Sequence, residues 1–190
     1  MHILAFSGSN RKDSFNQRLV AVAARGAQEA GVDTTIINLG DFSLPIYCQD
    51  LQNESGLPPE AQRLKNLFKE ADGFLIASPE YNSAFSPLLK NAIDWVSRSE
   101  GKDDPAGAAF AGKSAVLMAA SPGALGGLRG LVFLRMLLGN IGITVLPNQR
   151  AIPKAADAFL EDGNLRDEKV QASILNLGGT LAQHLQRLES

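Results

Sequence analysis

The 190-residue chain is poor in the residues that build metal centres and disulfide frameworks. It has one cysteine, Cys48, and two histidines, His2 and His184. A single cysteine excludes an intramolecular disulfide framework and a multi-cysteine zinc site. Two histidines leave little material for a histidine-rich centre, so we expect no metal site.

The chain also lacks an excess of basic charge and a long apolar run. Its 18 Lys and Arg residues face 20 Asp and Glu residues, a formal net charge of −2, which excludes nucleic-acid binding driven by phosphate neutralisation. No apolar run approaches the ~18 residues that span a bilayer. Residues 1–8 have neither the basic flank nor the apolar length of a signal peptide. We therefore expect a cytoplasmic protein without nucleic-acid or membrane partners.

What is present is an alternation of short apolar runs and helical stripes. Strands are expected at 3–6, 34–38, 73–77, 114–120 and 143–146, the last closed by Pro147. Helices are expected at about 17–30, 60–71, 89–99 and 127–141, and a final helix carries an apolar stripe from Val170 to Leu188. The breaker-rich segments 39–59 and 100–112 are expected to be loops.

This alternation predicts the fold class. Strands that are apolar throughout belong to parallel sheets covered on both faces. We predict one α/β domain over residues 1–190, a doubly wound five-stranded parallel sheet in flavodoxin-like order with three α/β/α layers. Ligands of such folds bind beyond the carboxyl ends of the strands, which selects the loops 7–16, 79–86 and 121–126.

The first of these loops has the composition of a phosphate site. Residues 8–16 read Gly-Ser-Asn-Arg-Lys-Asp-Ser-Phe-Asn directly before a helix. Small residues allow close approach of the backbone, Arg11 can bind an anion through two N–H groups, and a helix N-terminus favours negative charge. The alternative is an ordinary N-capping loop with a solvated Arg–Lys pair. The loop lacks G-x-G-x-x-G, which disfavours a dinucleotide turn.

The other two loops suit a flat ring. Residues 78–87 offer the Tyr81 ring, the Asn82 amide and exposed backbone N–H groups. Residues 121–127 are rich in small residues and can press their backbone against a ligand. The alternative for the second loop is a tight turn in which Tyr81 covers the core.

Three segments together resemble a known family. Gly8-Ser9-x-Arg11-x-x-Ser14-x-Asn16, Pro79-Glu80-Tyr81-Asn82 and the run from Leu89 to Trp95 are similar to the NADPH-dependent FMN reductases, above all to their bacterial quinone, chromate and azo-dye reductases. The resemblance implies a flavodoxin-like fold, bound FMN and NADPH or NADH as co-substrate. It also implies a small-molecule electron acceptor and a homodimer or dimer of dimers. Many members have proline where this chain has Ser86, followed here by Pro87.

The resemblance also implies roles for individual residues. Around the FMN phosphate it places Ser9, Arg11, Ser14, Phe15 and Asn16. Along the isoalloxazine it places Pro79, Glu80, Tyr81 and Asn82, and near the pyrimidine end Ser121 and Gly123. No catalytic side chain is expected, because a flavin carries the redox chemistry itself. Glu80 and Asp94 could relay protons, although a helix-capping or ion-pair role is an equal alternative.

Two competing interpretations come from the same sequence. A non-enzymatic electron carrier or flavin-binding regulator would share the fold, but carriers are typically strongly acidic, which this chain is not. Residues 107–114 match the P-loop pattern G-x-x-x-x-G-K-[ST]. A working P-loop follows a strand and opens a helix, whereas this segment leads into a strand, so we expect no nucleotide site there.

The helix at 128–141 predicts an interface. Leu131, Leu134, Leu138 and Ile141 form one apolar face, and Val132, Phe133, Met136 and Leu137 cover much of the rest. A helix that is apolar nearly all round is buried on more than one side. The sheet can cover one side, and a second subunit is expected to cover the other.

Overall fold

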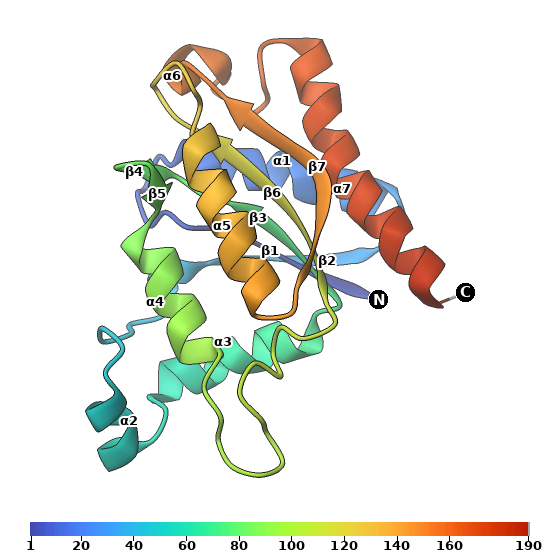
Figure 1. Cartoon of the computed structure of the whole chain (residues 1–190). Helices are drawn as coiled ribbons and strands as arrows, with labels where there is room; N and C mark the ends of the chain where they lie inside the picture. The colour runs from blue at the N-terminus through green and yellow to red at the C-terminus, as the bar shows by residue number, and fades with distance from the viewer. Residues whose placement is uncertain (190) are drawn as a thin grey trace.

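A computed structural model describes residues 1–189 of the chain (Figure 1). Its main sheet has the order β2-β1-β3-β6-β7, and all neighbouring strands are parallel. The strands are β1 (His2–Ser7), β2 (Asp33–Asn38), β3 (Gly73–Ala77), β6 (Ser114–Ala120) and β7 (Thr144–Ile152). This confirms the predicted flavodoxin-like order, in which the strand order reverses at β1 and β3.

Helices cover both faces of the sheet. One face carries α1 (Phe15–Glu29) and α7 (Glu168–Glu189), and the other carries α3 (Pro59–Glu70), α4 (Pro87–Val96) and α5 (Leu128–Asn140). Successive side chains of β1 serve opposite cores, since Ala5 packs with α1 and α7 whereas Phe6 packs among the other three helices. The three predicted layers are therefore confirmed.

Helices α1 and α7 touch through their backbones. A Cβ added at Gly178 would lie 1.8 Å from the Ala23 carbonyl oxygen, and one at Gly26 would lie 1.9 Å from the Leu175 carbonyl oxygen. No larger residue fits at either crossing point. This contact fixes the position of α1, whose first turn forms part of the site described below.

The prediction that Pro147 closes the last strand is wrong. In strand β7, Val145 pairs with Ala115. The register then shifts, and pairing resumes with Gln149 opposite Leu117, so the strand continues to Ile152. Pro147 lies in the irregular stretch of an edge strand. A proline has no N–H, but at this position no strand–strand hydrogen bond requires one.

The structure also contains short elements that were expected to be loop or connection. Segment 39–59 holds the 3-10 turn η1 (Leu39–Asp41) and the helix α2 (Gln49–Ser55), and α6 (Ala155–Ala158) precedes α7. No residue of α2 is buried, so it has no apolar stripe from which it could be predicted. Strands β4 (Glu80–Tyr81) and β5 (Ala84–Phe85) form a small antiparallel hairpin.

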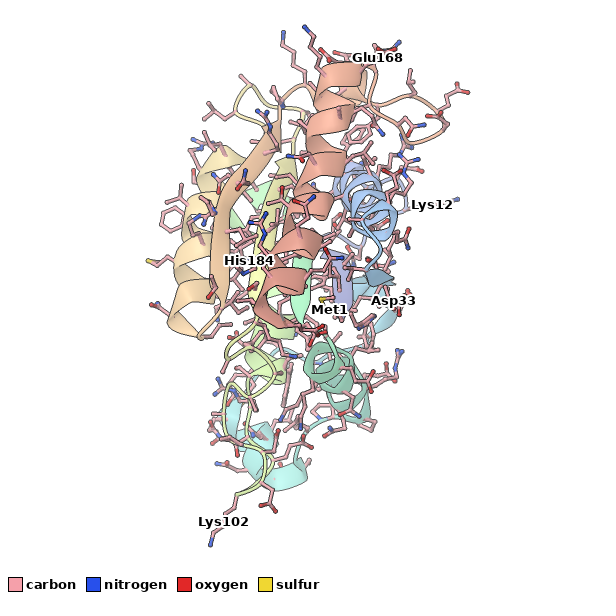
Figure 2. All side chains as sticks on the ribbon, turned by 90° about the vertical axis from the view of Figure 1, so that its right-hand side faces the viewer. Met1, Lys12, Asp33, Lys102, Glu168 and His184 are labelled. Atoms are coloured by element: carbon pink, nitrogen blue, oxygen red, sulfur yellow. The ribbon has the colours of Figure 1, made fainter. Side chains whose placement is uncertain are left out.

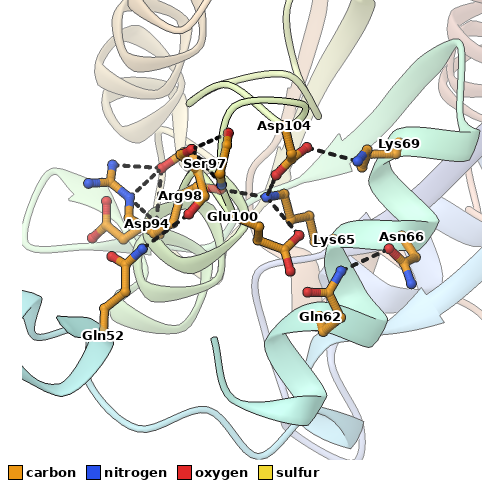
Figure 3. A network of polar contacts seen from close by, with 12 residues as sticks. Gln52, Gln62, Lys65, Asn66, Lys69, Asp94, Ser97, Arg98, Glu100 and Asp104 are labelled. Carbon is orange, nitrogen blue, oxygen red and sulfur yellow. Dashed lines mark hydrogen bonds and ion pairs between the residues drawn. The ribbon is translucent and has the colours of Figure 1, made fainter. Parts of the chain in front are cut away.

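The expected loop between α4 and β6 is held down by a buried lysine (Figure 3). The Lys65 side chain is 1% exposed; its Nζ contacts the Asp104 carboxylate and lies 3.1 Å from Glu100 Oε2. Lys69 Nζ donates to the other Asp104 oxygen at 2.8 Å. Figure 2 places Lys102, near the tip of this loop, at the opposite end of the molecule from Glu168 at the start of α7.

The P-loop-like segment has a structural role. Lys113 Nζ donates to the carbonyl oxygens of Phe68, Lys69 and Ala71, where α3 ends. The lysine therefore satisfies carbonyls that a helix end leaves without partners, which agrees with the rejection of a nucleotide site. Within residues 1–189, no helix is long and apolar enough to cross a membrane.

Candidate functional site

The first predicted loop connects β1 to α1 and is fixed by its own hydroxyl groups. Ser14 is the N-cap of α1, and its Oγ accepts a hydrogen bond from the Gln17 N–H at 3.3 Å. Ser9 Oγ accepts one from the Arg11 N–H at 3.4 Å, and the Gln17 side chain donates to the Ser9 carbonyl at 3.0 Å. The loop is thus shaped before any ligand arrives.

Asn16 joins this loop to the end of β6. Its amide nitrogen donates to the Ala120 carbonyl, and its amide oxygen accepts from the Ala120 N–H, both at 2.9 Å. The side-chain oxygen and one amide proton are therefore used within the fold. What Asn16 offers to a ligand is its backbone N–H in the first turn of α1, because that turn leaves its N–H groups without helical partners.

The hairpin β4–β5 brings the second loop to the same place. Its two turn residues, Asn82 and Ser83, have φ values of 51° and 70°, the left-handed conformation that a two-residue hairpin turn with matching twist requires. The turn leaves Tyr81 48% exposed. Tyr81 is thus available to a ligand. The alternative left open by the sequence, in which Tyr81 covers the core, does not hold.

Glu80 fixes the hairpin to α5. Its Oε1 accepts from Arg129 Nε at 2.9 Å and Nη2 at 2.7 Å, and its Oε2 accepts from the Gly130 N–H at 3.1 Å. Burial favours the neutral acid, but the hydrogen bonds from Gly130 and Arg129 outweigh it and hold the pKa of Glu80 below its ordinary value. Glu80 therefore acts as a helix-capping ion pair. Asp94 is likewise paired, with Lys90 at 2.6 Å.

Ser86 ties the first two loops together. Its Oγ accepts from the Leu89 N–H at 3.2 Å, which caps α4, and donates to the Gly8 carbonyl. A Cβ at Gly8 would lie 3.0 Å from this same oxygen, so any larger residue at this position would have to displace the Ser86 side chain. Serine in place of the family's proline thus adds a cap, and Pro87 takes the first helical position, which suits proline.

The third loop follows β6 and presses against the sheet. Gly126 and Gly127 have φ values of 63° and 93°, and a Cβ at Gly126 would lie 2.6 Å from the Ile152 carbonyl carbon. The Ser121 N–H donates to the Ile152 carbonyl at 3.1 Å. The Gly123 N–H donates to Ser121 Oγ at 3.2 Å, so this N–H is already engaged within the loop.

The three loops enclose a cavity of about 90 Å³. All the residues predicted for the site line it except Asn82 and Gly123, which lie outside it. Its lining residues are Ser9, Arg11, Ser14, Phe15, Asn16, Pro79, Glu80, Tyr81, Ala120, Ser121 and Pro122. Ala120, Pro122 and the Glu80 partner Arg129 were not predicted. The signal that could have indicated a role for Arg129 is its position in the first turn of α5, directly after Gly126-Gly127.

The donors around this cavity fit a phosphate. Hydroxyl groups come from Ser9 and Ser14, N–H groups from the first turn of α1, and a guanidinium from Arg11. Among residues 1–189, Arg11 has no ion-pair partner, so its charge is free to meet an anion. The volume suits a phosphate group, and a planar ring would extend beyond it over Tyr81 and the third loop.

Comparison with known proteins identifies the family of the chain. Residues 1–157 match the family model of the NADPH-dependent FMN reductases. An NAD(P)H-dependent FMN reductase of Pseudomonas aeruginosa is 35% identical over 174 residues, which cover 90% of this chain and 88% of that protein. A quinone reductase of Escherichia coli is 34% identical over 138 residues, covering 73% and 69%.

Solved structures show the same fold. The NAD(P)H:(acceptor) oxidoreductase FerB of Paracoccus denitrificans superposes with a TM-score of 0.81 at 29% identity, covering 98% of this chain and 97% of FerB. An archaeal flavodoxin shares the fold alone, with a TM-score of 0.65 at 13% identity over 98% of this chain and 99% of the flavodoxin. With the family match spanning most of its length, the chain belongs to the NADPH-dependent FMN reductase family.

Proposed function

We propose that this protein binds FMN and oxidises NADPH or NADH, passing the electrons to a quinone or a similar small acceptor. For a quinone the balance is NAD(P)H, a proton and the quinone going to NAD(P)+ and the hydroquinone. The observation that carries the proposal is a phosphate-sized cavity between three loops, on which the free guanidinium and hydroxyls of the first loop and the N–H groups of the first turn of α1 converge. Bound FMN supplies the chemistry, since a flavin exchanges hydride with nicotinamide and electrons with quinones.

The chain's own residues would bind and orient the cofactor. Arg11, Ser9, Ser14 and the first turn of α1 would hold the phosphate, while Tyr81 and Asn82 would lie along the ring. Glu80 would act indirectly, because it fixes the hairpin that carries Tyr81 and Asn82 to α5. Since reductant and acceptor would use the same open side of the ring, they would enter in turn, and ping-pong kinetics are expected. Free flavins, azo dyes and metal oxyanions are further candidate acceptors.

Replacing Arg11 by alanine tests the phosphate assignment. Loss of one charge-assisted hydrogen-bonding partner costs about 1.5–3 kcal/mol, so FMN affinity should fall about 10- to 150-fold. Riboflavin lacks the phosphate, and its affinity should stay unchanged. Lys12→Ala removes the same charge from an exposed neighbour that does not line the cavity and serves as the control. Equal losses for FMN and riboflavin, or no loss for either, would contradict the assignment.

We also propose that the protein forms a homodimer, or a dimer of dimers, through α5. Leu131, Leu134 and Leu138 face the sheet and are buried, whereas Val132, Phe133 and Met136 are 60%, 46% and 59% exposed. These three belong to a larger exposed apolar surface that begins at Leu125 and Leu128, and a groove between α4 and α5 continues it. A second copy offers the matching surface, which a two-fold interface requires.

Light scattering tests this interface. The full chain at micromolar concentration should have at least twice the monomer mass. Phe133→Glu places a charge on this surface and should give a monomer, whereas Gln62→Glu on α3, outside this surface, should not. A wild-type chain of monomer mass would overturn the proposal.

The single cysteine bears on the cellular location. The thiol of Cys48 is free and exposed, and a reducing compartment keeps such a thiol reduced. We therefore propose that the protein is cytoplasmic.

A further inference from the structure

A second and larger cavity lies at the edge of the sheet, apart from the flavin pocket. It has a volume of about 480 Å³ and lies between the end of β7, α6 and the first turns of α7. In Figure 1 these three elements meet at the top of the molecule. None of its lining residues belongs to the three loops of the flavin pocket, and the proposed function does not use it.

The floor of this cavity is apolar. Ile152 and Leu165 are buried, 5% and 4% exposed, and Val170 and Ala158 are half-buried beside them. The cavity is therefore a hollow over the edge of the hydrophobic core between α1, α7 and the sheet, to which Ile152 and Leu165 belong. An aromatic or aliphatic body would be removed from water there.

The wall of the cavity is preformed by a hydrogen-bonded loop between α6 and α7. The Leu160 N–H donates to the Asn164 carbonyl at 2.8 Å, and the Arg166 N–H donates to the Ala158 carbonyl at 2.9 Å. The Leu165 N–H donates to Gln171 Oε1 at 2.9 Å. These bonds fix the shape of the loop beside the strand, and small-molecule sites are usually largely preformed in this way.

The rim carries three cations from two segments of the chain. Arg150 is on β7, two residues before the buried Ile152, so its side chain leaves the sheet on the same face, over the cavity. Arg166 and Lys169 come from the start of α7 and the loop before it. Among residues 1–189, none of the three forms an ion pair.

Within residues 1–189, the two acidic residues on the rim form no ion pair with these cations. Asp167 Oδ1 accepts from the N–H groups of Lys169 at 2.8 Å and Val170 at 3.1 Å, so it is used at the start of α7. Asp157 contributes its backbone carbonyl, which accepts from Arg166 Nε at 3.3 Å. Three cations against two carboxylates leave the rim with an excess of positive charge over an apolar floor.

From this combination we propose that the cavity is a binding site for a small organic anion with an apolar body, such as an aromatic carboxylate or sulfonate. The ring would rest on Ile152, Leu165 and Val170. The anionic group would bind Arg150 and Lys169, whose side chains have no competing partner. The volume lies within the range of small-molecule sites, about 300–1,000 Å³, and exceeds what an inorganic ion needs.

The test compares a charged with a neutral probe on the full chain. The full chain is loaded with FMN and freed of unbound flavin, so that the FMN pocket is filled and no free anion competes. Naphthalenesulfonate and naphthalenemethanol are then titrated calorimetrically. The wild type should bind naphthalenesulfonate at least 10-fold more tightly than naphthalenemethanol. The double variant Arg150→Ala/Lys169→Ala should lose at least 10-fold in sulfonate affinity and less than twofold in alcohol affinity.

Controls separate this site from general charge effects. Lys12→Ala/Lys102→Ala removes the same charge from exposed positions outside the cavity (Figure 2) and should leave both affinities unchanged. Ser173→Trp, which fills the cavity from α7, should weaken both probes. The proposal is overturned if the wild type binds no naphthalenesulfonate, or if the Arg150/Lys169 variant binds it as tightly. Failure of FMN to bind would refute the proposed function. The comparison of sulfonate affinity between the wild type and the Arg150/Lys169 variant would still test the second cavity.

Discussion

Asp104→Asn tests how the fold holds the loop between α4 and β6. Burial disfavours the ionised form of Asp104, but hydrogen bonds from Lys65 and Lys69 outweigh it and lower its pKa from 3.8 to about 2. Because the folded-state pKa is the lower one, the stabilisation is complete well above pH 4 and is lost as pH falls toward 2. The shift corresponds to about 2 kcal/mol at neutral pH.

At neutral pH the substitution should cost more than that. Lys65 is 1% exposed and would keep only Glu100 and the Arg98 carbonyl as partners. Leaving a buried charge without its partner costs about 3–5 kcal/mol. Because Glu100 Oε2 remains 3.1 Å from Lys65 Nζ, we expect the lower end of that range. Lys69→Met is the matched control, since Lys69 binds the same carboxylate but is 41% exposed. This substitution should lower the free energy of unfolding much less.

Urea unfolding at pH 6 and pH 2 measures both effects. The difference in unfolding free energy between wild type and Asp104→Asn should shrink by about 2 kcal/mol from pH 6 to pH 2. At pH 2 the carboxyl of Asp104 is about half protonated in the folded state and almost wholly protonated in the unfolded state, so most of its stabilisation is lost. A difference that does not change with pH would refute the assignment of the low pKa to this contact. Equal losses for Asp104→Asn and Lys69→Met would refute the claim that burial of Lys65 sets the magnitude.

Two further substitutions test the packing that positions the pocket proposed for FMN. Gly178→Ala should lower the free energy of unfolding by about 3 kcal/mol or more, since its Cβ would lie 1.8 Å from the Ala23 carbonyl oxygen. The control is Gly179→Ala, whose Cβ meets its nearest atom at 3.6 Å, and which should be nearly neutral in thermal unfolding. Asn16→Leu should cost about 2–3 kcal/mol in urea unfolding, because both backbone groups of Ala120 lose their partner; a loss below about 0.5 kcal/mol would show that water replaces the amide.

Periodicity predicted the elements that bury an apolar face. The strands of the sheet and the helices α1, α3, α4, α5 and α7 all contain residues that pack into one of two cores. Helix α2 and hairpin β4–β5 escaped prediction because neither carries an apolar stripe or alternation over enough residues. Their conformations depend on contacts with distant segments, such as Glu80 with Arg129.

The site was predictable in its loops more than in its contacts. Arg11 and Ser14 stand out in the sequence because a helix N-terminus after a buried strand is a known anion site. The pairing of Asn16 with Ala120 was not predictable, since the partners are far apart in sequence and one of them offers only its backbone. The same holds for the cavity beside β7, whose rim joins Arg150 to Lys169 across α6.

The claim that this pocket holds FMN for reduction by a nicotinamide is tested most directly by one spectroscopic titration. The full chain is mixed with FMN, freed of unbound flavin, and titrated with NADPH without oxygen. We predict that the protein retains FMN, that NADPH bleaches the flavin absorption band, and that added quinone restores it. A chain that retains no FMN, or whose bound flavin NADPH does not bleach, would contradict the account.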